Sequence, residues 1–283
     1  MLSLRPGQKE VAVYREGLLA VPAIPGAGKT TVLAHLASEL IAEGKTKPGK
    51  ILIVTVMNSA VANFRSRIGD FLDKKGISRS KGYEVKTLHS LAMTILKEKP
   101  EFLLINSGFQ ILDEARQDEI IKEVSARWIR LNSSRWQGSI KLDKDKDKNW
   151  YQKALGSWEQ RDLPEFFKQA VSYIKSQGID LANAQELRDR ISDDSFLAWA
   201  IEVYFEYAKL LRANGQLDFD DLIFQALRLL QEDQGVLERL RNRWTYIFED
   251  EAQDSNPLQE MILKLLSSGN LVRVGDSNQA IMG

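Results

Sequence analysis

Nine consecutive residues near the N-terminus have the types and spacing of a loop that binds phosphate groups: Ala23, Ile24, Pro25, Gly26, Ala27, Gly28, Lys29, Thr30 and Thr31. An apolar run precedes them and apolar residues at helical spacing follow them, which predicts a strand, a glycine-rich turn and a helix. Such a turn directs several backbone N–H groups into one concavity, and the helix dipole adds positive potential there. We therefore expect this segment to hold the phosphates of a nucleotide.

Individual residues of this loop have separate expected roles. Gly26 and Gly28 let the backbone approach the phosphates closely, and Lys29 places a positive charge on the β- and γ-phosphates. Thr30 offers its hydroxyl to Mg²⁺. The usual pattern begins with Gly where this chain has Ala23. An ordinary glycine-rich turn with a solvated lysine is the alternative, and the presence of the other parts of an ATPase site decides between the two.

Four polar residues downstream complete such a site: Asp250, Glu251, Gln253 and Gln279. Cleavage of a phosphoanhydride needs a metal ion across the phosphates, a positive charge on them and a group that orients water. We expect Asp250 to hold Mg²⁺ together with Thr30, and Glu251 to polarise the attacking water. Gln253 and Gln279 can hydrogen-bond the γ-phosphate or that water. Taken alone, an acid pair after a strand is often only a solvated loop.

The elements that must position these residues alternate between strand and helix at both ends of the chain. Strands are predicted at 18–21, 50–56, 84–87, 244–248 and 271–274, the first of them buried, and helices follow the first three. The alternation predicts a parallel α/β sheet with right-handed crossovers, whose carboxyl edge carries the loop and the downstream polar residues. From about residue 102 the helical period dominates, which predicts a helical insert.

Three features of this middle region have simple interpretations. The run 141–148 alternates in charge and predicts a mobile loop. A helix starting near residue 217 carries Asp218, Asp220 and Asp221 in its first turn, which suits the helix dipole and needs no function. Core packing explains most of the tryptophans, although one or two could be exposed stacking platforms for bases. These tryptophans are Trp128, Trp136, Trp150, Trp158 and Trp199.

Composition limits the classes of site that the 283 residues can form. Lysine plus arginine and aspartate plus glutamate number 39 each, so a nucleic-acid site has to be a local patch. The absence of cysteine excludes disulfides, cysteine-ligated zinc and iron–sulfur clusters, and two histidines make a histidine-rich metal site improbable. The longest apolar run, 51–57, is too short to span a bilayer, and no signal-type segment begins the chain. We expect a cytoplasmic protein without a membrane partner.

The residues resemble a known family of motor proteins. Residues 250–259 and 274–281 look like motifs II and III of UvrD/Rep-type superfamily 1 DNA helicases. Other segments agree in order: Gln8 with the adenine-reading glutamine motif, 23–30 with motif I, 55–58 with motif Ia, 87–91 with motif Ib, and 218–222 with the acidic-aromatic segment that follows the insert. Without the resemblance, Gln8 is more simply an exposed surface glutamine. In that family Ala at position 23 is acceptable.

The resemblance implies a RecA-like domain, residues 1–104 and 215–283, interrupted by a helical subdomain at 105–214. It also implies ATP and Mg²⁺ as cofactors and movement from 3′ to 5′ along single-stranded DNA. The residues that it places on the DNA side are Thr55, Asn58, Thr87 and His89. Three positions depart from the family, because Val56, Leu88 and Met282 stand where it usually stacks aromatic side chains on bases. Such stacking contributes roughly 1–3 kcal/mol per base, so DNA binding is expected to be weaker or to rely on the backbone.

The family also has a second RecA-like domain with arginine fingers, which the 283 residues do not include. Either the sequence is a fragment of a longer helicase or a partner chain supplies that domain. Since an arginine finger contributes on the order of 10³–10⁵ in rate, we expect this chain alone to bind ATP with Mg²⁺ but to hydrolyse it slowly and not to unwind duplex DNA. Two other functions remain open: an ATP-binding switch without efficient hydrolysis, and a P-loop enzyme of another class such as a small-molecule kinase.

Overall fold

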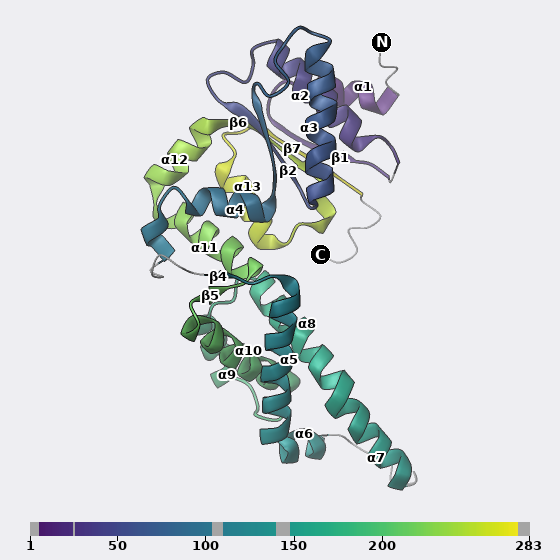
Figure 1. Cartoon of the computed structure of the whole chain (residues 1–283), viewed down its shortest axis with the longest axis vertical. Helices are drawn as coiled ribbons and strands as arrows, with labels where there is room; N and C mark the ends of the chain where they lie inside the picture. Colours follow the sequence, from purple (N-terminus) through teal and green to yellow (C-terminus); the bar gives the residue numbers. More distant parts are fainter. Residues whose placement is uncertain (1–5, 25, 104–109, 140–147, 277–283) are drawn as a thin grey trace. The chain divides into compact units, whose positions relative to one another are not determined.

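The computed structural model describes residues 6–24, 26–103, 110–139 and 148–276, and the chain divides into two compact units (Figure 1). Residues 1–103 and 225–283 form the first, called here the sheet unit, and residues 104–224 form the second, the helical unit. The second division falls inside helix α11 (Phe219–Glu232) and not at 214/215. That these units are the domains expected from the sequence stays a prediction.

The sheet unit is built on a five-stranded sheet in the order β1-β7-β6-β2-β3. Its strands are β1 (Leu18–Pro22), β2 (Lys50–Thr55), β3 (Tyr83–Thr87), β6 (Trp244–Asp250) and β7 (Leu271–Gly275). Every neighbouring pair is parallel, so all five carboxyl ends lie at one edge. The predicted α/β class with a parallel sheet is confirmed.

The first strand is not buried, and this prediction was wrong. β1 is an edge strand, and within the described part of the chain it pairs only with β7. Leu19 and Val21 pack against the core, whereas Leu18 is 78% exposed. Because one face of β1 is covered and the other is not, its exposure alternates along the strand. A four-residue apolar run cannot distinguish coverage of one face from coverage of both.

Helices cover the sheet from both sides. They are α1 (Pro6–Ala12), α2 (Lys29–Ala42), α3 (Asn58–Asp73), α4 (Leu88–Leu96), α12 (Gln234–Arg243) and α13 (Pro257–Leu266), with 3-10 turns at Pro100–Leu103 and Ala252–Asp254. Ile51 and Ile53 of β2 join the core cluster formed with α2 and α3. Leu52 and Val54 are equally buried and alternate to the other face, where α4 contacts β2. Residues 51–54 of β2 are all apolar because successive side chains point to opposite faces of the sheet and helices cover both faces.

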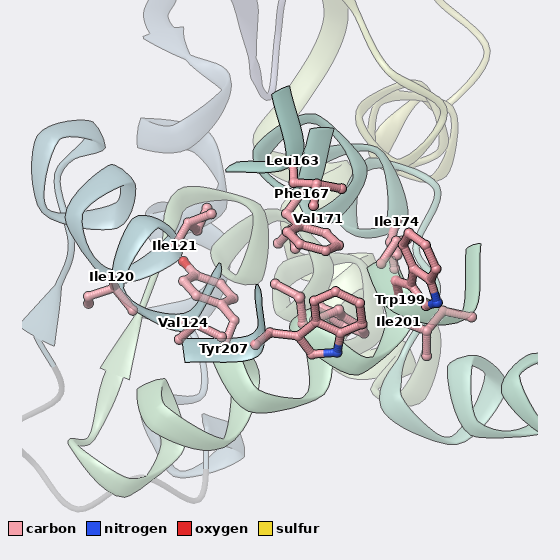
Figure 2. Close-up of a cluster of buried hydrophobic side chains, with 14 of the residues drawn as sticks. Ile120, Ile121, Val124, Leu163, Phe167, Val171, Ile174, Trp199, Ile201 and Tyr207 are labelled. Carbon is pink, nitrogen blue, oxygen red and sulfur yellow. The ribbon is translucent and has the colours of Figure 1, made fainter. Parts of the chain in front are cut away.

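The helical unit packs around one aromatic-rich core (Figure 2). Its helices are α5 (Glu114–Leu131), α6 (Ser133–Ser139), α7 (Lys148–Ser157), a π-helical turn (Trp158–Asp162), α8 (Leu163–Ser176), α9 (Leu181–Asp189), α10 (Phe196–Ala213) and the start of α11. Trp128, Trp136 and Trp199 are buried in it, and Trp150 is 43% exposed. Residues 141–147 of the predicted loop lie outside the described residues.

Two details of the helical unit differ from expectation. Strands β4 (Gln110–Ile111) and β5 (Gln216–Leu217) form a short parallel pair, which two residues each are too few to signal by periodicity. The acidic start of α11 does more than match the helix dipole. Asp218 is fully buried and forms an ion pair with Lys175, and the partly exposed Asp221 pairs with the same ammonium. Among the described residues, no helix combines the length and apolarity needed to cross a membrane.

Candidate nucleotide-binding and catalytic site

The predicted phosphate loop connects β1 to α2 and has the backbone that such a loop needs. Gly26 and Gly28 have positive φ angles of 75° and 80°, a region that favours glycine. Gly28 directly precedes the first residue of α2, so the loop ends at a helix N-terminus. The loop is tied to the neighbouring strand by a hydrogen bond of 2.8 Å from the Ala23 N–H to the Gly275 carbonyl. Pro25 lies outside the described residues.

Gln8 packs against this loop and is not a free surface residue, so the simpler interpretation of it was wrong. Its Nε2 donates to the Ala27 carbonyl at 2.7 Å. A Cβ added to Gly28 would lie 2.9 Å from the same nitrogen, so a larger residue there would displace the Gln8 side chain. Gln8 and Lys29 line a cavity of about 350 Å³ whose other walls include valine side chains. An apolar cleft with a carboxamide at one side has the chemistry that an adenine ring requires.

A chain of hydrogen bonds joins the loop to the carboxyl ends of β6 and β7. Lys29 Nζ lies 2.5 Å from Glu251 Oε2, and Gln253 Nε2 donates to the same oxygen at 2.9 Å. The side-chain oxygen Oε1 of Gln253 accepts from the Asp276 N–H, also at 2.9 Å. Gln253 Oε1 lies close to the backbone of Gly275, because a Cβ added to this glycine would be only 2.8 Å from it. Residues predicted from distant parts of the sequence thus meet at one edge of the sheet.

Glu251 has a strained backbone and a stabilised negative charge. Its φ of 58° makes it the one residue other than glycine with positive φ among those described. This conformation costs of the order of 1–3 kcal/mol and is often found where function fixes a side chain. Burial works against the charged carboxylate, but the hydrogen bonds from Gln253 and Lys29 outweigh it and lower its pKa. Glu251 is therefore ionised near neutral pH.

Asp250 has the properties of a metal ligand. It is 4% exposed, and its Oδ1 has no hydrogen-bond partner among the described residues. Burial, with the neighbouring Glu251 charge, raises its pKa to about 6. A buried carboxylate oxygen left unbonded is costly unless a ligand completes it. Mg²⁺ prefers oxygen ligands and is often held by one or two protein groups plus phosphates and water, so Asp250 with the Thr30 hydroxyl fits it.

Sequence reasoning missed several residues that support this edge. Glu249 is 1% exposed and is held by Arg273 Nε and Ser255 Oγ, each at 2.5 Å. The sequence did contain a signal for this ion pair, since Glu249 and Arg273 are charged residues within otherwise apolar predicted strands. Arg67 of α3 donates to Thr31 Oγ1 at 2.5 Å. The contacts of Arg273 and Arg67 could not be predicted from local spacing, because each joins residues far apart in the chain.

The predicted DNA-side residues lie at the carboxyl ends of β2 and β3 and just beyond them. Thr55 and Thr87 are register partners, and both are buried. The Thr87 hydroxyl caps α4 by accepting from the Ser90 N–H at 3.2 Å. Asn58 is exposed at the first residue of α3, and burial lowers the pKa of the half-buried His89.

Two of the sequence predictions concern residues that cannot be placed. Gln279 and Met282 lie outside the described residues, so the expected γ-phosphate contact of Gln279 stays a prediction. The other two departures from the family pattern are described. Val56 is 46% exposed at the end of β2, whereas Leu88 is 7% exposed in α4. Of these two aliphatic positions, only Val56 offers surface to a ligand.

Comparison with known proteins agrees with the geometry. The model of the UvrD/REP helicase N-terminal domain matches residues 4–283. The ATP-dependent DNA helicase PcrA of Staphylococcus aureus strain Mu50 is 30% identical over 278 residues, and PcrA of Staphylococcus epidermidis strain ATCC 12228 is 29% identical over the same length. These alignments cover 98% of this chain and 33% of each relative, so the chain spans about a third of the length of the curated relatives that it matches. The chain belongs to the UvrD/REP helicase N-terminal domain family.

Proposed function

We propose that this chain is the ATP-binding part of a DNA helicase, which couples Mg²⁺-dependent ATP hydrolysis to movement from 3′ to 5′ along single-stranded DNA. The observation that carries the proposal is the convergence of Lys29, Glu251 and Gln253 at the carboxyl edge of the sheet, beside the buried carboxylate of Asp250. This set supplies the charge, the water-orienting group and the metal ligand that phosphoanhydride cleavage requires.

Each residue has a stated part in the proposed reaction. The loop N–H groups and Lys29 bind the phosphates, for which the Lys29 ammonium has to leave Glu251. Asp250 and Thr30 hold Mg²⁺, which neutralises charge on the phosphates when bound. Glu251, released from Lys29, accepts a hydrogen bond from the attacking water and orients it. Gln253 holds Glu251 in place by a hydrogen bond to Oε2, the oxygen that Lys29 also contacts.

The DNA and partner assignments rest on the family and on position in the fold. Asn58 and His89 follow the carboxyl ends of β2 and β3, next to the Thr55–Thr87 pair. We place single-stranded DNA on this side of the sheet unit. A second RecA-like domain, in the same protein or in a partner, would supply arginine fingers, so the 283-residue polypeptide tested by itself should hydrolyse ATP slowly and should not unwind duplex DNA. A cytoplasmic location belongs to the same proposal.

Two substitutions test the catalytic assignment in the 283-residue polypeptide. Lys29→Ala should abolish binding of a fluorescent ATP analogue, because it removes the charge on the phosphates. Glu251→Gln should keep nucleotide binding and lower the single-turnover hydrolysis rate by about 10²–10⁴, the usual contribution of such a group. Glu119→Gln, exposed on α5, is the matched control and should change neither quantity.

Two results would contradict the proposal. Undiminished hydrolysis by Glu251→Gln would remove that carboxylate from the mechanism. Strong turnover of the polypeptide by itself, stimulated by single-stranded DNA, would remove the need for a second domain. Turnover that ignores single-stranded DNA in a longer protein carrying that domain would favour a different class of P-loop enzyme.

A further inference from the structure

A pocket of about 530 Å³ lies beside β3, away from the nucleotide site. Arg65 of α3, Arg79 of the connection to β3, and Glu84 and Lys86 of β3 are among its lining residues. β3 is the last strand of the sheet, so its outer side pairs with no strand among the described residues. Three of the side chains that line the pocket are cations, namely Arg65, Arg79 and Lys86.

The one carboxylate that lines the pocket is already engaged. Glu84 accepts from Lys50 at 3.0 Å and from Arg243 at 3.0 Å. Burial favours its neutral form, but the hydrogen bonds from these two cations prevail and lower the pKa of Glu84. Lys86 reaches the same carboxylate only at 3.8 Å. Three cations thus share one anion.

The other cations leave the pocket with an excess of positive charge. Arg79 is bonded to Asp70 at 2.8 Å and to Asp73. Arg65 donates to the Val85 carbonyl at 3.1 Å and makes no ion pair with the described residues. The charged groups that line the pocket, taken with their ion-pair partners, are five cations, Lys50, Arg65, Arg79, Lys86 and Arg243, and three carboxylates, Asp70, Asp73 and Glu84. In a chain with no net charge, this is a local positive patch.

Lys86 is the cation for which a ligand matters most. Burial lowers its pKa, and the positive charges of Arg243 and Arg65 lower it further against the opposing effect of Glu84. An anion in the pocket would stabilise the charged ammonium and would also meet the free N–H directions of the Arg65 guanidinium. A tetrahedral oxyanion suits this mixture, because arginine forks and ammonium groups both bind phosphate oxygens.

The position of the pocket selects the source of the phosphate. Lys86 directly precedes Thr87, and Arg65 follows Asn58 on α3 by two helical turns. Lys86 therefore neighbours one residue of the proposed DNA side, and Arg65 lies about 10 Å along α3 from another. We propose that this pocket binds backbone phosphates of single-stranded DNA and extends the DNA path along β3, an inference that rests on the proposed function. The competing explanation is that the cations only keep an exposed strand edge from pairing with another chain.

Binding of fluorescently labelled oligothymidine to the 283-residue chain, measured by anisotropy at several salt concentrations, tests this proposal. Lys86→Ala and Arg65→Ala should each weaken binding by about threefold to tenfold at low salt. Each should also reduce the slope of log affinity against log salt by about 0.7, the value for one single-strand phosphate contact. Lys45→Ala, which removes a charge from the exposed turn after α2, is the matched control and should leave the slope unchanged. Binding of the ATP analogue should be the same in all four proteins.

The outcomes separate this inference from the proposed function. If the parent binds oligothymidine and both pocket variants match it in affinity and slope, the inference is overturned while the function stands. If the parent binds the ATP analogue but no oligothymidine, the DNA part of the function and the inference both fail. Inorganic phosphate is the second probe. If it competes with oligothymidine only at concentrations far above those of the oligonucleotide phosphates, and the variants weaken oligothymidine binding, the site recognises the nucleic-acid backbone.

Discussion

Two clusters of buried charge, one in each unit, look alike in composition but differ in how completely they are bonded. In the helical unit, Lys175 lies 2.5 Å from Asp218 and 2.8 Å from Asp221. In the sheet unit, Lys29 lies 2.5 Å from Glu251, which adjoins the buried Asp250. Both clusters thus pair one lysine with two neighbouring acids.

The helical cluster is closed. Asp218 Oδ2 accepts from Lys175 and, at 2.7 Å, from the Tyr207 hydroxyl, and Asp218 Oδ1 accepts from the Asp221 N–H at 2.9 Å. Burial favours the neutral acid, but the Lys175 charge and these hydrogen bonds lower the pKa of Asp218. Asp250 differs from Asp218, because its Oδ1 is buried without a hydrogen bond among the described residues and its pKa is raised to about 6. The second acid of each cluster has the opposite shift, since burial raises the pKa of Asp221 and the hydrogen bonds from Gln253 and Lys29 lower that of Glu251. The unbonded oxygen of Asp250 therefore distinguishes the open cluster, which a bound ligand would stabilise.

The largest expected effect breaks the closed cluster. Lys175→Met keeps the length of the side chain but leaves the buried Asp218 and the partly exposed Asp221 without their cation. Loss of the cation from a buried pair typically destabilises by about 3–5 kcal/mol. Urea unfolding followed by circular dichroism should show the helical signal lost at a much lower denaturant concentration than in the parent.

A matched control lies on the same helix. Lys168 of α8 forms an ion pair with Asp118 at 2.6 Å that is partly exposed. Lys168→Met should cost no more than about 1 kcal/mol, because solvent replaces the lost partner. Equal effects of the two substitutions would show that burial and closure of the Lys175 cluster contribute nothing special.

The next effect concerns the open cluster and has the opposite sign. Because the pKa of Asp250 is raised from 3.8 to about 6, the folded protein binds this proton more tightly than the unfolded chain does. Stability from this group is therefore lost as pH rises from about 4 to 6 and stays lost above. Asp250→Asn mimics the protonated acid and removes this loss. The variant should gain about 1.4 kcal/mol per pH unit over the parent within that window.

A second aspartate gives the contrary trend and serves as the control. The hydrogen bond from Lys99 lowers the pKa of Asp233, so its stabilising contribution is present at neutral pH and is lost on acidification below about pH 4. Asp233→Asn should therefore fall behind the parent as pH rises through that range. Unfolding curves at several pH values distinguish the two. An Asp250→Asn variant whose advantage does not change between pH 4 and 6 would argue against a raised pKa and an open site.

The sequence predicted the open cluster better than the closed one, for a physical reason. Asp250 ends a strand of a parallel sheet and Lys29 and Glu251 follow strands of it, and that topology by itself brings strand ends to one edge. Asp218 follows only a two-residue strand and takes its partner from α8, so its burial depends on how helices pack. The acidic residues at the start of α11 therefore led to the prediction of a helix-dipole effect, and the buried ion pair between Asp218 and Lys175 was not predicted.

The same limit explains the other differences. The glycine spacing predicted the left-handed turns at 26 and 28, because few other residues accept positive φ. No sequence pattern predicted the positive φ of Glu251, because a residue other than glycine adopts this conformation only where its tertiary contacts hold it there. Likewise the apolar run at 18–21 predicted a strand correctly but not its exposure, because strand order is a property of the whole sheet.

The smallest effect concerns a residue that belongs to the open edge but is itself closed. Both ends of the Gln253 amide are used, one by Glu251 and the other by the Asp276 N–H. Gln253→Leu should lower stability by about 1 kcal/mol, because it leaves that N–H without an acceptor. It should also raise the pKa of Glu251, because the hydrogen bond from Gln253 is the largest of the effects that lower this pKa.

The acid limb of the pH profile of hydrolysis should then move to higher pH. Gln185→Leu, at an exposed position of α9, is the control and should leave the profile unchanged. If Gln253→Leu instead abolished turnover at every pH without affecting stability, the amide would act directly on the phosphate or the water, and the edge would be open at Gln253 as well as at Asp250.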